Sequence, residues 1–154
     1  MTLTTPLPAR SGPRPRTTAS NPHTQLDQQP TDPGLRERLA ARLFALPGVV
    51  ERPSAISVPG ARALTLPQSR PRLQLFLVGT EFAHLHPAPD LSLHTVLPRE
   101  LVAEAIGAGW AEPHPIARRG LIPDTVVMLY APREETELEV VAGLIAAAHA
   151  LLAP

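Results

Sequence analysis

Three of the six histidines in this chain lie within one short stretch, EFAHLHPAPDLSLH, at residues 81–94. Leucine, alanine and phenylalanine surround them. Apolar surroundings hold an imidazole toward its neutral form, because desolvation disfavours the charged ring. A neutral imidazole can act as a general base near pH 7 and can also bind a metal ion. His84, His86 and His94 are therefore candidate site residues. The alternative is that each is a half-buried histidine bonded to the backbone.

The elements that must position these histidines read as a three-stranded meander. Residues 72–78 (RLQLFLV) are predicted to be a strand, and Gly79-Thr80 fits a two-residue type II′ turn with glycine first. Residues 81–86 return antiparallel, and residues 91–96 can add a third strand. The short turn fixes the register, so that Leu75 pairs with His84 and Leu73 with His86.

Strand alternation then predicts which side chains share a face. Phe82, His84 and His86 should lie on one face over leucines of the first strand, whereas Glu81 should point to the opposite face. If Ser92 and His94 join the face of His84, three imidazoles and a hydroxyl group gather on one side of the sheet.

A second block with chemical potential is GWAEPHP, at residues 109–115. Glu112 and His114 are two residues apart in a proline-stiffened segment, so they can point the same way and pair an orienting carboxylate with an imidazole. Trp110 is the only tryptophan. Such a residue serves most often in a core or as a loop anchor. The same block could equally be a surface loop without a function.

Composition excludes several classes of protein. The 154 residues carry 14 arginines, no lysine and 14 acidic residues, so the formal net charge is zero and a charge-driven nucleic-acid partner is disfavoured. The absence of cysteine excludes disulfides, thiolate catalysis and iron–sulfur clusters. Phosphate-binding glycine loops and the HExxH and GxSxG motifs are also absent. No apolar run approaches the ~20 residues that span a bilayer, and no apolar secretory signal is visible. We expect a soluble, cytoplasmic protein with no membrane partner.

The pattern along the chain predicts a single α+β domain over residues 33–154. Asp32-Pro33 should start a helix that ends at Pro47-Gly48, residues 98–109 read as a short helix, and residues 132–152 as the longest helix. Short strands are expected at 49–58, 61–66 and 125–131, and residues 110–123 as loop. The predicted fold is a mostly antiparallel sheet of about five to six strands, packed by two long helices on one face and one short helix. Residues 1–32, rich in proline, threonine and arginine, are predicted to be a disordered tail.

The order of these blocks resembles a known family. EFAHLHP, SLH, GWAEPHP and VMLYAPREETELEVV together resemble the luciferase-like domain typified by fungal luciferases. The resemblance covers roughly residues 35–152 and is most specific over 81–140. It implies a compact α+β domain related to oxygenases that add O₂ to a hydroxylated pyrone-type substrate without a recognised organic cofactor. We expect a small bacterial relative.

The resemblance also implies roles for individual residues. The positions that match the family's motifs divide into candidate catalytic residues, which are His84, His86, His94 and His114, and candidate substrate-binding residues, which are Ser92, Trp110, Glu112 and Tyr130. The predicted function is a cofactor-independent, oxygenase-like reaction on an aromatic or enolic small molecule, in which His84 or His86 removes a proton.

Two other hypotheses remain open at this point. The four histidines offer enough imidazoles for zinc, iron or copper, which would make the protein a metal-dependent enzyme; the leading hypothesis has no metal. The protein could instead be a non-catalytic module that binds a ligand on its sheet face and recruits a partner through its tail. The sequence does not specify an oligomeric state.

Overall fold

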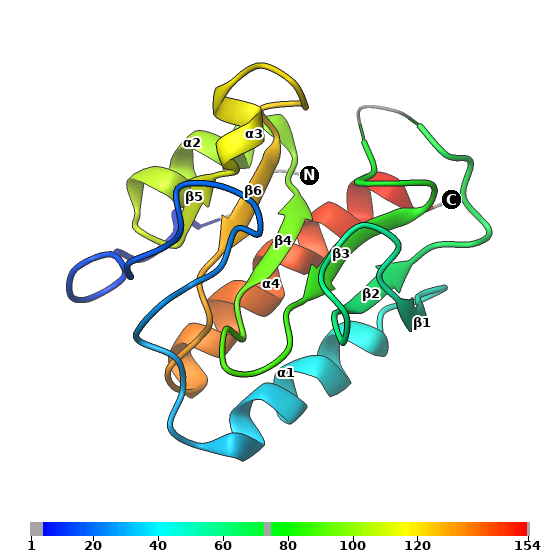
Figure 1. Ribbon diagram of the computed structural model, residues 1–154. Coiled ribbons are helices and arrows are strands. Elements are labelled where there is room, and N and C mark those ends of the chain that lie inside the picture. Colours follow the sequence, from blue (N-terminus) through cyan, green and yellow to red (C-terminus); the bar gives the residue numbers. More distant parts are fainter. Residues whose placement is uncertain (1–4, 73–74, 154) are drawn as a thin grey trace.

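The strands around the histidines form the middle of a sheet in the computed structural model, which describes residues 5–72 and 75–153. Among these residues one antiparallel sheet has six strands in the order β1-β2-β3-β4-β6-β5 (Figure 1). The strands are β1 (Val50–Pro53), β2 (Arg62–Thr65), β3 (Glu81–Leu85), β4 (Leu93–Val96), β5 (Ala111–Pro113) and β6 (Val126–Leu129).

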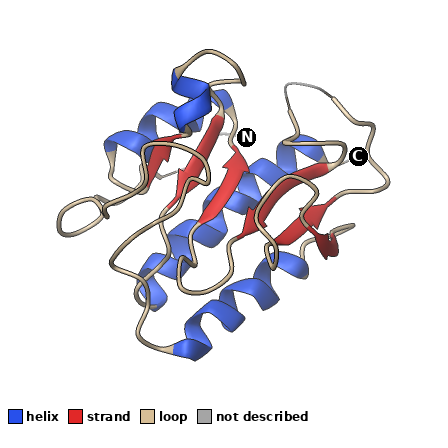
Figure 2. Cartoon of the chain, viewed as in Figure 1, coloured by secondary structure: helices blue, strands red, loops and turns tan. Residues whose placement is uncertain are grey.

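Two long helices cover one face of this sheet (Figure 2). α1 (Pro33–Phe44) begins where Asp32 accepts a hydrogen bond from the Gly34 N–H, and α4 (Glu135–Leu152) packs against α1, β3 and β4. The shorter α2 (Arg99–Gly107) packs beside β5, and α3 (Pro115–Arg118) is a single turn. The predicted α+β class, the number of strands and the two long helices on one face are confirmed.

The hydrophobic core lies between the helices and the sheet. The leucine stripe of α1 is buried, as are the apolar residues of α4 at helical spacing. Deep burial of such side chains contributes about 1.5–3 kcal/mol each relative to exposure. The core therefore covers the face of the sheet that packs against α1 and α4. The histidines of β3 and β4 lie on the opposite face.

The predicted strand over residues 72–78 is wrong. Arg72 C=O accepts from the N–H groups of Leu75 and Phe76, which makes a turn there, and residues 73 and 74 lie outside the described part. The Gly79-Thr80 turn does form, since Val78 bridges Glu81. The place beside β3 belongs to β2, whose Ala63 lies opposite His84 where Leu75 was expected.

An extra residue in β3 changes which side chains face the histidines. Leu64 pairs with Ala83 but the next residue, Thr65, pairs with Glu81, so Phe82 bulges out of the pairing. Such a bulge shifts the alternation of side chains by one position. Phe82 consequently enters the core beside His149, and Glu81 shares the face of His84. The expectation that Phe82 shares the face of His84 and that Glu81 points to the other face was wrong for this reason.

Two further elements replace a predicted loop. Residues 111–113 add β5 to the edge of the sheet, and residues 115–118 form α3. A strand of three residues, such as β5, is too short to show a periodic pattern in the sequence. α3 does carry a recognisable signal, because Pro115 stands in the first turn, where proline is common in helices.

The N-terminal segment, residues 5–31, lies across the face of the sheet opposite α4 (Figure 1). It is tied to the domain by backbone and side-chain hydrogen bonds. Arg10 N–H donates to Ala108 C=O, Arg14 to Ala111 C=O, and Gln25 N–H to Asp90 Oδ1. The predicted disorder of the tail is thus not confirmed for these residues, because their buried polar groups find partners on the domain.

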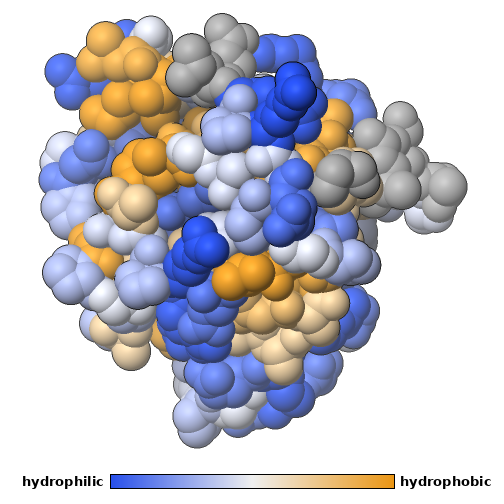
Figure 3. All heavy atoms as spheres, turned by 90° about the vertical axis from the view of Figure 1, so that its right-hand side faces the viewer, coloured by the Kyte–Doolittle hydropathy of each residue, from blue (hydrophilic) through white to orange (hydrophobic). Residues whose placement is uncertain are grey.

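The molecular surface mixes polar and apolar residues. On the side that carries β1 and β2, hydrophobic side chains reach the surface in patches separated by hydrophilic ones (Figure 3). Exposed large apolar residues elsewhere in the described chain include Ile56, Val78 and Leu121. None of the described helices combines the length and apolar character that crossing a bilayer would require.

Candidate functional site

Five histidines converge on the face of the sheet that α1 and α4 leave open. They are His23, His84, His86, His94 and His114. The closest ring centroids, those of His86 and His94, are 4.6 Å apart, and His94 contacts all four of the others. The structure therefore brings together the four histidines chosen from the sequence and adds a fifth from the N-terminal segment.

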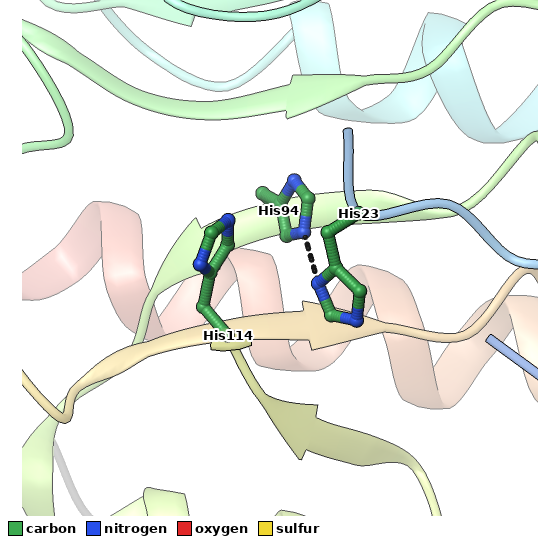
Figure 4. Close-up of side chains that lie close together, drawn as sticks. All are labelled: His23, His94 and His114. Carbon is green, nitrogen blue, oxygen red and sulfur yellow. Dashed lines mark hydrogen bonds between the residues drawn. The ribbon is translucent and has the colours of Figure 1, made fainter. Parts of the chain in front are cut away.

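Strand pairing explains why His94 is at the centre. It lies on β4 directly opposite His84 on β3, and on its other side opposite Met128 on β6. His86 follows the end of β3, where its N–H donates to Ser92 C=O. His114 follows β5 and caps α3. His23 reaches the same place from the segment that crosses this face (Figure 4).

These imidazoles line a cavity of about 620 Å³. His84, His86, His94 and His114 line it together with side chains from three other parts of the chain. The apolar lining comes from the loop after β1, the turn before β3 and the stretch from α3 to the start of β6: Ile56, Val58, Phe76, Leu77, Ile116, Leu121, Ile122, Pro123 and Val126. Residues 21–24 of the N-terminal segment complete the wall. The cavity is thus apolar around a polar, nitrogen-rich floor.

Acidic side chains hold two of the histidines from behind. His84 Nδ1 lies 2.8 Å from Glu81 Oε2. His86 Nδ1 lies 2.9 Å from Ser92 Oγ, which donates to Asp90 Oδ1 over 2.6 Å, and Asp90 Oδ2 is 3.1 Å from the same nitrogen. A carboxylate behind an imidazole keeps the proton on the near nitrogen, so the far nitrogen presents a lone pair.

A third carboxylate acts through His23. His23 Nε2 lies 2.9 Å from Glu112 Oε2, and His23 Nδ1 lies 2.9 Å from His94 Nε2 (Figure 4). Glu112 also accepts hydrogen bonds from Tyr130 OH and Thr17 Oγ1. The predicted pairing of Glu112 with His114 does not form; Glu112 is bonded to His23 instead.

His114 is oriented by the backbone. Its Nδ1 accepts a hydrogen bond from the Ile116 N–H at 3.1 Å, so the proton of the neutral ring is on Nε2. Burial, with contributions from the neighbouring histidines, lowers the pKa of His114 to about 4. The ring is therefore neutral near pH 7 and is an N–H donor rather than a base.

Burial shapes the charges of the other groups as well. It lowers the pKa of His84 and holds that of His94 well below its usual value, where the surrounding imidazoles act in the same direction. Burial opposes ionisation of Glu81, Asp90 and Glu112, but the hydrogen bonds that each accepts outweigh it and lower the pKa of all three. His84, His94 and His114 are therefore neutral near pH 7, and the three carboxylates beside the cluster are ionised.

With this geometry in place, comparison with known proteins gives the family. Residues 79–148 match the family model of the luciferase domain. The luciferase of Armillaria ostoyae is 31% identical over 159 aligned residues, which cover 92% of this chain and 59% of that protein. The chain carries a luciferase-like domain. The predicted family resemblance is therefore confirmed.

Other fungal relatives agree. The luciferase of Armillaria gallica aligns with the same identity and coverage, and that of Neonothopanus nambi is 38% identical over 69 residues, or 44% of this chain and 26% of that protein. The chain spans about three-fifths of the length of the Armillaria proteins. No solved structure matches the chain significantly.

None of the four predicted substrate-binding residues lines the cavity, and three of them instead support the histidines from behind. Ser92 and Glu112 contact histidines, and Tyr130 contacts Glu112. Trp110 does not join them: it is part of the hydrophobic core, and its Nε1–H donates to Pro8 C=O. Trp110 is not among the residues that line the cavity.

Sequence reasoning missed three residues that the luciferase-like domain uses to arrange its histidines. His23 lies in a proline-rich segment without periodicity, so nothing in the sequence linked it to residues 70 or more positions away. Glu81 was placed on the wrong face because the bulge at Phe82 was not foreseen. Asp90, two residues before Ser92, could have been found, since an Asp-x-Ser turn often bonds internally.

Two sets of three histidines have the spacing to hold a metal ion. One comprises His84, His86 and His94, and the other His23, His94 and His114; in each, one nitrogen per ring lies within 4.8 Å of the others. Because His94 belongs to both sets, the two sets are alternative metal positions within one histidine cluster.

Proposed function

We propose that this chain is a small-molecule enzyme of the oxygenase type that acts on an aromatic or enolic hydroxyl compound. The observation that carries the proposal is the convergence of five imidazoles on the floor of an apolar cavity. The family supports it, because the relatives carry the name luciferase. The activity of those longer proteins is not assumed for this chain, and light emission is not part of the proposal.

The cavity suits a flat molecule of modest size. Its volume of about 620 Å³ falls in the range of small-molecule sites, which is roughly 300–1,000 Å³. Apolar side chains such as Ile56, Phe76 and Ile122 would contact the faces of a ring, and the imidazoles would contact its oxygen substituents.

The chemistry begins with ionisation of the substrate hydroxyl at the histidine cluster. The lone pairs of His84 and His86 point away from their carboxylates and can accept that proton. The resulting enolate carbon supplies two electrons to O₂, a C–O bond forms, and a proton completes a hydroperoxide. The net reaction adds O₂ to the enol and converts C=C–OH into O=C–C–OOH, with the proton from the hydroxyl group ending on the peroxide. His114, with its proton on Nε2, would donate a hydrogen bond to the oxygen that develops charge.

Oxygen uptake tests this proposal. The protein is incubated with a panel of polyphenols and enolic pyrones in an oxygen electrode, beside a His84→Ala, His86→Ala double variant. We expect uptake by the wild type and a loss of about 100-fold or more in the variant, the usual scale for removing acid–base catalysis. His149→Gln is the matched control, because His149 lies on α4 and bonds Pro47 C=O on the far side of the sheet.

Two results would contradict the proposal. Equal uptake by the wild type and the double variant would remove the histidine cluster from the reaction. A wild type that consumes no oxygen with any compound, and from which a bound ligand is recovered unchanged, would favour the non-catalytic binding module.

A further inference from the structure

A continuous row of contacts crosses the site from one carboxylate to another. It runs from Glu81 through His84, His94 and His23 to Glu112. The four contacts measure 2.8 Å, 3.3 Å, 2.9 Å and 2.9 Å in that order. Each imidazole in the row thus uses both of its ring nitrogens.

The number of protons in this row is one too few. Every hydrogen bond needs one proton, and a neutral imidazole has one. The two ends cannot supply any, because each carboxylate already accepts from other donors: Glu81 from Ser54 Oγ and Ala55 N–H, and Glu112 from Thr17 Oγ1 and Tyr130 OH. When all three rings are neutral, they fill three of the four contacts.

The unfilled contact can be identified. Glu81 accepts a hydrogen bond from the Nδ1–H of His84, so Nε2 of that ring carries no proton and presents a lone pair. Glu112 accepts a hydrogen bond from the Nε2–H of His23. In a neutral ring His23 Nδ1 then carries no proton and accepts a hydrogen bond from the Nε2–H of His94. His94 Nδ1 is then also a lone pair, and it faces His84 Nε2 across the longest contact of the row, 3.3 Å.

A third unprotonated nitrogen belongs to His86, whose ring contacts those of His84 and His94. Ser92 Oγ donates its proton to Asp90 Oδ1, so it must accept from His86 Nδ1. His86 Nε2 is consequently unprotonated. One nitrogen from each of His84, His86 and His94 lies within 4.8 Å of the other two. Buried nitrogens without a proton need a partner, and a cation bound between the three rings would satisfy all of them at once.

We propose that His84 Nε2, His86 Nε2 and His94 Nδ1 bind a divalent first-row transition metal ion. Imidazole nitrogens suit zinc, iron, copper and nickel. With metal–nitrogen bonds of about 2.0–2.1 Å and tetrahedral angles, two ligand nitrogens are about 3.3–3.4 Å apart, which agrees with the 3.3 Å between His84 and His94. A bridging proton would fill that contact alone and leave His86 Nε2 unused.

The shell behind these ligands has the character of a metal site. Each ligand ring donates its other N–H toward a carboxylate: His84 directly to Glu81, His86 through Ser92 to Asp90, and His94 through His23 to Glu112. Carboxylates in this position orient metal-binding imidazoles and raise their basicity.

The other set of three histidines does not fit. His114 Nδ1 accepts from the Ile116 N–H, which places the ring proton on Nε2 and removes the lone pair that a metal would need. His23 has both nitrogens committed to His94 and Glu112. Both residues therefore stay outside the coordination sphere.

The metal would have an open position toward substrate. All three ligands line the cavity, and catalytic sites with three protein ligands keep further positions for water or substrate. Only the catalytic role of the metal rests on the proposed function: the substrate hydroxyl would ionise on the metal, which would take the place of a histidine base.

Cobalt absorption tests the site without any reaction. Protein purified without a histidine tag is treated with a chelator, dialysed and titrated with Co²⁺, and visible absorption is recorded. We expect a band that saturates at about one ion per chain and is displaced by Zn²⁺. His84→Ala and His94→Ala should abolish it, whereas Glu81→Gln should keep it and weaken affinity by roughly 10–100-fold.

The controls and outcomes separate the alternatives. His149→Gln and His114→Asn should bind like the wild type, and circular dichroism checks that each variant is folded; if His84→Ala is unfolded, Glu81→Gln decides. The inference is overturned if the wild type gives no saturable band, or if His114→Asn abolishes the band. Oxygen uptake by metal-free protein would overturn the role of the metal in ionising the substrate and leave the proposed function standing. A saturable cobalt band without oxygen uptake would support the metal site and count against the proposed function.

Discussion

At the scale of single residues, the site depends on groups that fix where protons lie. Four of the five clustered histidines have a ring nitrogen whose role is set by a carboxylate, a hydroxyl or a backbone N–H. The fifth, His94, takes its tautomer from His23. The residues that decide the chemistry are therefore the partners Glu81, Asp90 and Glu112 as much as the rings themselves.

Tyr130 offers a test at this scale. Its hydroxyl donates to Glu112 Oε1 at 2.9 Å, and burial raises its pKa to about 12, so it remains a donor throughout the neutral range. Tyr130→Phe removes that bond to a charged group while keeping the ring in place. We expect a loss of about 1.5–3 kcal/mol in the free energy of unfolding, measured by urea denaturation. A variant as stable as the wild type would show that Glu112 does not need this donor.

At the scale of elements, two irregular features assemble the site. The bulge at Phe82 turns Glu81 onto the histidine face, and the N-terminal segment brings in His23. Neither belongs to the regular pattern of strands and helices. The luciferase-domain match covers residues 79–148, so the bulge lies inside it and His23 outside. The regular sheet holds His84 opposite His94, and the irregular features supply their partners.

Gln25 anchors the N-terminal segment and can be tested separately. Its Oε1 accepts from the buried Ala131 N–H, and its own N–H donates to Asp90 Oδ1. Gln25→Ala leaves the Ala131 N–H unpaired, which should cost about 1–3 kcal/mol. We expect faster hydrogen exchange over residues 17–29, measured by mass spectrometry, with α4 unchanged.

The matched control is Leu26→Ala, because that neighbouring side chain is half exposed. It should exchange like the wild type. If Gln25→Ala and Leu26→Ala gave the same exchange, the segment would be held by its backbone bonds rather than by Gln25.

At the scale of the whole molecule, the sheet separates two environments. One face packs on α1 and α4 and supplies the apolar core, and the other gathers five imidazoles beside a cavity. Stability and chemistry therefore depend on different faces of the same strands. The exception is His149, which lies on the helical face beside Phe82.

Acid should destabilise the metal-free protein through these imidazoles. The folded-state pKa of His94 lies well below the unfolded value of about 6.5, and that of His114 falls to about 4. Below about pH 6.5 the unfolded chain binds protons that the folded chain does not, so stability is present above that pH and is lost as the pH falls. A buried histidine that stays neutral contributes a slope of about 1.4 kcal/mol per pH unit.

Urea denaturation between pH 7 and pH 5, in the presence of a chelator, measures this slope. His114→Asn should flatten it while keeping the cap of α3, since asparagine is a good N-cap residue. A stability that is constant over this range, or that rises on acidification, would mean that the cluster takes up protons in the folded state.

The sequence by itself determined the features that depend on local pattern. Leucine spacing, caps and glycine turns predicted α1, α4 and the Gly79-Thr80 turn, and alternation placed His84, Ser92 and His94 on strands near one another. The motif blocks gave the family. These signals are encoded within a few residues of one another, so they can be read without coordinates.

Only the tertiary structure decided how the candidate site is completed. β2 displaced residues 72–78 from the side of β3, a one-residue bulge moved Glu81 to the histidines, and His23 arrived from 71 positions before His94. Trp110, which looked like a site residue, packs in the core. These outcomes depend on contacts between distant segments, and a single shift of strand register reverses the face on which every following side chain lies.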